Sequence, residues 1–133
     1  MLFCSMVSAL PKKVHGRRQE ITDQFLMMVE EHLTKLMSGE IEHRMSTKHF
    51  ADLLFIAPRH LTNTVKSVLH KSPCDVMEAR IKEESQALLA NTTLSIAEIS
   101  YKFGYQDTTN FIKFYKGMTG VTPLQYRKSL LKT

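Results

Sequence analysis

The sequence has few of the residues on which disulfide scaffolds, metal sites and phosphate-binding loops depend. Its two cysteines, Cys4 and Cys74, lie far apart and outside any redox or metal spacing, so we expect free thiols in a reducing compartment. The six histidines are accompanied by no cysteine pair and no two-histidine helical turn with a nearby acid, which argues against zinc. The five glycines form no phosphate-cradling loop.

Patterns typical of catalysis, of membrane insertion and of β-structure are also missing. There is no Gly-x-Ser-x-Gly elbow, and we expect neither an enzyme nor a cofactor. The apolar opening from Met1 to Leu10 is too short to span a bilayer and lacks a basic start and a cleavage-type ending, so we expect neither signal peptide nor anchor. Because apolar and polar residues alternate over no more than a few positions, the chain is predicted to be all-helical.

What the chain has instead is apolar residues at helical spacing. Its 133 residues, 43% of them apolar, suffice for one compact domain or for two small subdomains that share a helix. A first, supporting helix is predicted over about 20–37, with Gly39 as its terminator. Residues 1–19, whose basic residues lie around a proline and a glycine, are expected to form a flexible linker or tail. Four methionines in helical patterns are expected in the core: Met27, Met28, Met77 and Met118.

One helical unit occurs twice. Its apolar skeleton is Phe50, Ile56, Leu61, Val65 and Pro73, which returns about fifty residues later as Ile99, Tyr105, Phe111, Tyr115 and Pro123. Each copy predicts a short helix, a tight turn and a second amphipathic helix, the arrangement that places one helix in the major groove of DNA. The copies cover about 47–70 and 95–118, and together they suggest two grooves bound in tandem.

Capping residues mark where the remaining helices begin. Ser72, followed by Pro73 and by an acid, predicts the start of a long connector helix over about 73–90. Ser95 and Glu98 form a capping box at the start of the second copy. A similar pattern at Thr122 predicts a short final helix over about 123–131.

The second helix of each copy carries a polar face opposite its apolar stripe. In the first copy the outward residues are Arg59, Asn63, Lys66 and His70, with Thr62 on the flank. In the second copy Phe111, Phe114, Tyr115 and Met118 are expected to be buried, and Thr109, Lys113 and Lys116 to face outward beside Thr108 and Asn110. Arginine, asparagine and threonine can meet base edges, and lysine can neutralise phosphate. Either face alone is equally typical of an ordinary solvated helix, but the repetition favours DNA.

The distribution of charge supports the same interpretation better than the net charge of +5 does. Segment 56–73 contains basic residues and no acid, and segment 101–128 contains five basic residues against Asp107 alone. Both segments include a predicted recognition helix, while acids gather elsewhere, where they would not repel phosphate.

A longer run of residues is more specific: Arg80, Ala87-Leu88-Leu89, Ser95-Ile96-Ala97-Glu98-Ile99, Gly104-Tyr105, Phe114-Tyr115-Lys116 and Thr122-Pro123-Leu124-Gln125-Tyr126-Arg127. Through it, residues 80–128 resemble the signature region of the AraC/XylS family of bacterial transcription regulators, and the first copy is similar through Phe50-Ala51 and Pro58-Arg59-His60-Leu61. The resemblance implies an all-α domain over 20–133, with about seven helices and two helix-turn-helix subdomains joined by the connector. It places the DNA-reading positions at Arg59, Thr62, Asn63, Thr108, Thr109, Asn110 and Lys113.

Three departures from the family pattern have physical consequences. Ala57 stands where the family often has a capping serine, so the first recognition helix lacks a side-chain cap at its start. Asn63 and Lys113 stand where arginine is common, and lysine cannot reproduce a planar bidentate contact with a base. The effector-binding domain usual in the family is missing from this chain, so no small-molecule effector site is expected in it.

The predicted function is sequence-specific binding of double-stranded DNA by a bacterial regulator that reads two successive major grooves. We expect a cytoplasmic, nucleoid-associated protein with no membrane partner, and the resemblance suggests RNA polymerase as a second partner. The alternative is a helical protein-interaction module in which only the second helix-turn-helix contacts DNA. That alternative stays open because Thr62 and Asn63 offer only small, uncharged polar groups for contacts with bases.

Overall fold

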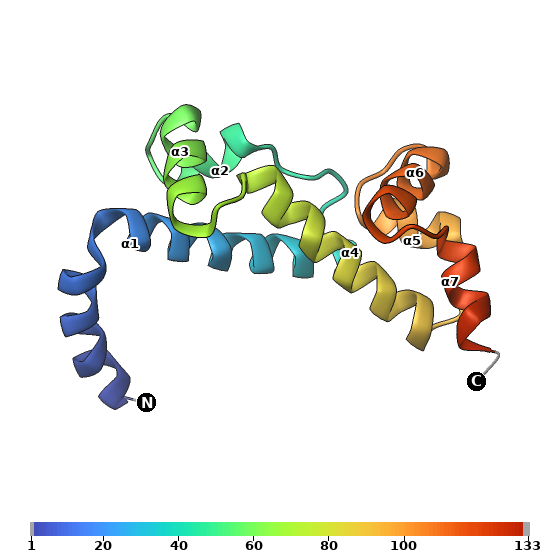
Figure 1. The fold of residues 1–133 in the computed structure, drawn as a ribbon, viewed down its shortest axis with the longest axis horizontal. Coiled ribbons are helices and arrows are strands. Elements are labelled where there is room, and N and C mark those ends of the chain that lie inside the picture. Colours follow the sequence, from blue (N-terminus) through green and yellow to red (C-terminus); the bar gives the residue numbers. More distant parts are fainter. Residues whose placement is uncertain (1, 132–133) are drawn as a thin grey trace. The chain divides into compact units, whose positions relative to one another are not determined.

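The computed structural model describes the backbone of residues 2–131 and the side chains of residues 16–131. Over that range all regular secondary structure is helical, which confirms the predicted all-α class (Figure 1). The helices are α1 (Leu2–Ser38), α2 (Thr47–Leu53), α3 (Pro58–Leu69), α4 (Pro73–Asn91), α5 (Ile96–Lys102), α6 (Thr108–Thr119) and α7 (Pro123–Leu130).

Local capping explains why helices start where the sequence indicated. Ser95 accepts a hydrogen bond from the amide of Glu98, whose carboxylate accepts one from the amide of Ser95. That contact lowers the pKa of Glu98, because the backbone hydrogen bond stabilises its charged form. Thr122 forms the same reciprocal pair with Gln125, and Ser72 forms it with Asp75. Each pair satisfies amide donors that a bare helix end leaves open.

Helix α1 is longer than predicted and is broken at Gly16, where φ is 77° and ψ is −176°. The part after the break begins ahead of the predicted start at residue 20 and buries an apolar stripe that includes Phe25, Val29 and Leu33. His32 is buried on the same stripe, and its pKa is lowered by burial and by the nearby positive charges of Arg44 and Lys35. Cys74 is an exposed free thiol, and Cys4 lies outside the described side chains.

The chain divides into two compact units, which we describe separately. The first unit comprises Met1–Glu30 and Met45–Val76, and the second comprises Glu31–Arg44 and Met77–Thr133. In the first unit α2 and α3 pack together (Figure 1). Helix α2 meets α1 through Phe50 and Phe25, whose ring centroids lie 5.3 Å apart edge to face. In the second unit α6 packs against α5 and α7 (Figure 1). The buried side chains of this unit include Phe103, Phe111 and Tyr115.

Two of the methionines expected in the core are exposed, so those predictions are wrong. Met27 is 71% exposed because it lies about half a turn from Phe25 and from Val29, which point inward. Met118 is 41% exposed because it lies in the last turn of α6, beyond the buried Tyr115. In α6 the apolar spacing placed Phe111 and Tyr115 correctly but extended the buried stripe too far along the helix, to Met118.

The missing cap of α3 provides a test of these local interactions. Ala57 is the N-cap residue, has the extended backbone that suits a cap (φ −72°, ψ 146°) and makes no side-chain cap hydrogen bond. We expect Ala57→Ser to raise the free energy of unfolding by about 1 kcal/mol, because a hydroxyl would accept from an open amide of the first turn. Urea denaturation measures it, with Ser95→Ala as the control that should lose about as much. An unchanged midpoint for Ala57→Ser beside a lowered one for Ser95→Ala would contradict the expectation.

Candidate nucleic-acid interface

Helix α3 separates a buried face from an exposed polar face. Leu61 and Val65 are fully buried against the first unit. Arg59, Asn63 and Lys66 are exposed, and their spacing of four and then three positions places them on one face of the helix. Thr62 is half-buried at the edge of that face, as expected for a flanking position.

A proline marks one end of α3 and a residue with left-handed backbone marks the other. At its start Pro58 occupies the first turn, and no acidic residue is present there. At its end His70 is the C-cap residue, in the left-handed conformation with φ 61°. His70 therefore lies beyond the helix, not on its outward face as the sequence suggested.

Helix α6 repeats the arrangement of α3. Phe111 and Tyr115 are fully buried, and Thr109, Lys113 and Lys116 are exposed with the same spacing of four and then three positions. Asn110 is exposed beside them. The N-cap residue Asp107 accepts a hydrogen bond of 2.9 Å from the amide of Thr109, which fixes the start of the helix.

Thr108 differs from the other predicted contact residues of α6. It is half-buried, and its hydroxyl lies 3.3 Å from the hydroxyl of Ser100, a fully buried residue of α5. Ser100 in turn donates to the carbonyl of Ala97. Thr108 thus links the two helices of this helix-turn-helix and helps to set the angle at which α6 is presented.

The turn between α5 and α6 is braced by the loop that follows α1. The guanidinium of Arg44 lies 4.5 Å from the ring centroid of Tyr105, a cation–π contact. Gly104 has φ 83°, and a Cβ there would lie only 3.1 Å from Cγ of Arg44 and 3.2 Å from its amide nitrogen. The ammonium group of Lys102 donates to the carbonyl of Met37 at 3.0 Å.

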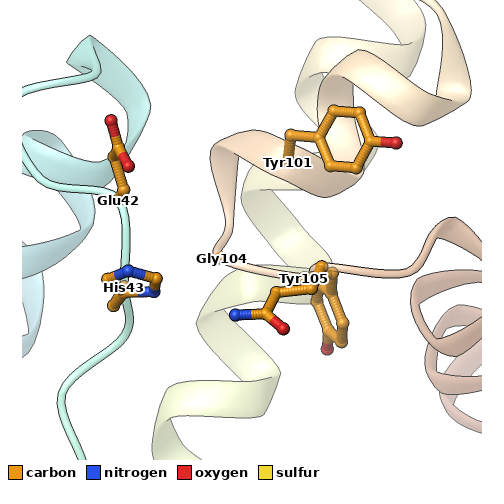
Figure 2. Close-up of a pocket in the computed structure, with 6 residues that line it drawn as sticks. Glu42, His43, Tyr101, Gly104 and Tyr105 are labelled. Atoms are coloured by element: carbon orange, nitrogen blue, oxygen red, sulfur yellow. The ribbon is translucent and has the colours of Figure 1, made fainter.

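A shallow cavity of about 550 Å³ lies beside this brace. It is lined by Glu42, His43, Tyr101, Gly104, Tyr105 and Gln106, as Figure 2 shows. Because its lining mixes an acid, an imidazole and two phenols around an open mouth, it does not define a ligand of one chemistry.

Arg127 is one of the five basic residues of segment 101–128, but its side chain binds backbone carbonyls. Its guanidinium donates to the carbonyls of Leu89, Thr92 and Leu94 at 3.1, 3.2 and 2.6 Å. It therefore joins α7 to the end of α4 and the loop after it. Arg127 and Lys102 are therefore two cations of segment 101–128 whose side chains hold parts of the second unit together.

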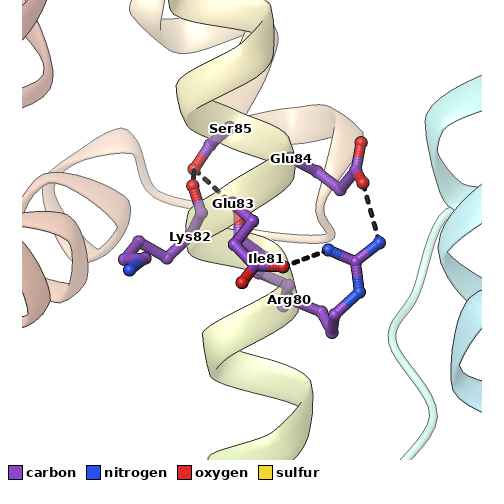
Figure 3. A network of polar contacts seen from close by, with 6 residues as sticks. All are labelled: Arg80, Ile81, Lys82, Glu83, Glu84 and Ser85. Carbon is purple, nitrogen blue, oxygen red and sulfur yellow. Dashed lines mark hydrogen bonds and ion pairs between the residues drawn. The ribbon is translucent and has the colours of Figure 1, made fainter. Parts of the chain in front are cut away.

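Glu83 and Glu84 of α4 are engaged within their own helix. Arg80 donates to Glu83 and to Glu84, and Ser85 donates to the carbonyls of Ile81 and Lys82 (Figure 3). Elsewhere Lys48 pairs with Asp52 at 3.0 Å. By contrast, the structure shows no ion pair for the cations of the α3 and α6 faces within residues 16–131.

Two further findings concern metals and membranes. Across the described side chains, no three His, Cys, Asp or Glu residues gather where they could hold a metal ion. Within the described residues, no helix combines the length and the apolar character that a membrane span requires.

Sequence reasoning missed three features of these units. The Arg44–Tyr105 contact joins distant positions, and nothing local predicts it. The capping box of α2 uses His49 in place of the usual Glu or Gln, so the common Ser-x-x-Glu signature does not predict it. Phe55 has φ 60°, which could have been noticed because the repeat aligns it with Gly104.

Comparison with known proteins agrees with this geometry. The model of a family described as "Helix-turn-helix domain" matches residues 50–129. The chain is 23% identical over 122 residues to the uncharacterized HTH-type transcriptional regulator YtdP of Bacillus subtilis, covering 92% of this chain but only 15% of that protein's length.

Solved structures show the same fold. The C-terminal domain of AraT, a response regulator from Geobacillus stearothermophilus, matches with a TM-score of 0.75 at 24% identity, over 86% of this chain and 88% of that one. The DNA-binding domain of the global transcriptional factor AdpA, solved in complex with a target DNA, matches with a TM-score of 0.62 at 15% identity, over 74% and 91% of the two chains.

Proposed function

Since the chain belongs to the AraC-type helix-turn-helix family of DNA-binding transcription regulators, we propose that it binds specific double-stranded DNA sequences with α3 and α6 in successive major grooves. Two recognition helices on one duplex would occupy grooves about 34 Å apart. The DNA-binding domain extends over 20–133, and 1–19 form a tail that precedes it.

The observation that carries this proposal is the repeated exposed face. Arg59, Asn63 and Lys66 on α3 recur as Thr109, Lys113 and Lys116 on α6 at identical spacing. Several cations outside these faces are held by acids, carbonyls or a ring, among them Lys48, Arg127 and Arg44. Cations kept away from intramolecular partners are available to phosphate.

The proposed roles follow from the chemistry of each side chain. Base edges are read by Arg59, Thr62 and Asn63 from α3 and by Thr109, Asn110 and Lys113 from α6. Lys66 and Lys116 neutralise phosphate. Thr108 is also proposed to contact DNA. Its hydroxyl both donates and accepts, so it can make a second hydrogen bond beside the one it shares with Ser100.

The proposal extends to the cellular role. The chain acts by binding, without catalysis or cofactor, on the nucleoid in the cytoplasm, and it influences transcription by contacting RNA polymerase. Bending of the DNA brings both grooves to the two helices.

A salt series tests whether both copies engage DNA. Two engaged copies with six or more phosphate contacts should lose affinity roughly a thousandfold between 50 and 200 mM salt. A protein that uses α6 alone, with about half as many contacts, should lose affinity only by a few tens of fold. The shallow result would favour the protein-interaction alternative for the first copy.

Substitutions on the two faces should separate specificity from affinity. We expect Lys113→Ala to reduce the ratio of specific to non-specific affinity, because it removes a base contact. Lys66→Ala should weaken binding to all sequences about equally and reduce the salt slope by about one. Fluorescence anisotropy on a selected duplex and a scrambled one measures both, and the reverse pattern would show that the roles are assigned wrongly.

A further inference from the structure

Phe55 lies in the turn between α2 and α3 in a conformation that aromatic residues rarely adopt. Its φ is 60°, in the left-handed region that glycine occupies without cost. Its side chain is 93% exposed. The residue is thus strained in its backbone and gains no burial within the first unit.

The second copy shows what this turn requires. The repeat aligns Ile56 with Tyr105, and therefore Phe55 with Gly104, whose φ is 83°. There the loop at Arg44 covers the turn so closely that a Cβ would not fit comfortably. The turn therefore forms without any side chain at this position, as Gly104 shows, and the phenyl ring of Phe55 is not needed to form it.

The surroundings of the ring favour a polyanion. No acidic residue occurs from Leu53 to Cys74, and the preceding acid, Asp52, is paired with Lys48. Arg59 and His60 are exposed at the start of α3, a few residues beyond the ring. An exposed apolar ring a few residues from exposed basic side chains complements the sugar–phosphate strand of DNA, which offers apolar sugar faces between phosphates.

We propose that the phenyl ring of Phe55 packs against deoxyribose rings of the DNA strand that flanks the groove entered by α3. This inference rests on the proposed function, since in a helix-turn-helix the element before the recognition helix crosses the DNA backbone. Removing an apolar ring from water on binding is favourable, and contacts with sugars carry no base information. The ring therefore adds affinity for every sequence alike.

Four proteins test this inference: the wild type, Phe55→Ala, Phe55→Gly and Phe55→Tyr. On both a selected and a scrambled duplex, Phe55→Ala and Phe55→Gly should bind roughly tenfold more weakly, and Phe55→Tyr about as well as the wild type. Phe55→Gly should melt a few degrees above Phe55→Ala, because both lack the ring and only glycine relieves the backbone strain. The melting comparison also shows that weaker binding does not come from unfolding.

Three outcomes would overturn the inference. If Phe55→Ala binds DNA with wild-type affinity, the ring touches no DNA. If that variant also loses self-association, the ring instead contacts a second copy of the chain. A loss of affinity confined to the selected duplex would show that the ring contacts bases. If the wild type binds no duplex and Arg59→Ala changes nothing, both the proposed DNA binding and the role of Phe55 fail. If the wild type binds DNA and Phe55→Ala binds equally well, only the role of Phe55 fails.

Discussion

Replacing Phe111 with alanine is expected to lower the free energy of unfolding of the second unit by about 3–5 kcal/mol. Phe111 is fully buried in α6, and its ring centroid lies 5.5 Å from that of Tyr105 and 6.1 Å from that of Tyr115. The substitution removes the apolar surface that the ring buries and leaves a cavity among these rings, which have little freedom to close it.

Hydrogen exchange of the α6 amides measures this loss where it occurs. Met118→Ala is the matched control, because Met118 belongs to the same helix but is exposed, and it should cost well under 1 kcal/mol. Exchange of α6 that is equally slow in Phe111→Ala and in the wild type would contradict the burial of this ring.

Replacing Arg127 with methionine should lower the free energy of unfolding by about 2–4 kcal/mol. The three carbonyls of Leu89, Thr92 and Leu94 lose a charged donor, and methionine keeps most of the aliphatic stem. Because these bonds hold α7 to the end of α4, the variant should also expose the loop over residues 92–94 to proteolysis.

The neighbouring Lys128 provides the control for this substitution. It is exposed, and we expect Lys128→Met to change the free energy of unfolding by no more than about 0.5 kcal/mol. If both variants unfold at the same urea concentration, the guanidinium contributes nothing to joining α7 to α4. If Arg127→Met folds normally but loses affinity for all DNA, Arg127 is a phosphate contact as the sequence grouping implied.

Features governed by neighbouring residues could be predicted from the sequence. The starts of α4, α5 and α7 follow from caps at Ser72, Ser95 and Thr122, each of which acts within four residues. The end of α5 follows from Gly104, which takes a positive φ. Helical spacing likewise identified the stripe that Leu61 and Phe111 bury in the two recognition helices.

Features that depend on contacts between distant segments could not be predicted. In the sequence Arg127 and Lys128 are two adjacent basic residues that nothing local tells apart. Only the folded chain brings three carbonyls to the guanidinium of Arg127. Arg44 reaches Tyr105 because the loop after α1 belongs with the second unit. Composition therefore overestimated the positive charge that segment 101–128 can offer to DNA, and it gave no indication of what holds α6 in place.

The central claim is that α3 and α6 read one duplex together, and a binding selection on random duplexes tests it most directly. We predict one long asymmetric site with two specified blocks about one helical turn apart. Substitution of Asn63 should relax only one block, and substitution of Lys113 only the other. A single short block, indifferent to the residue at position 63, would contradict the claim.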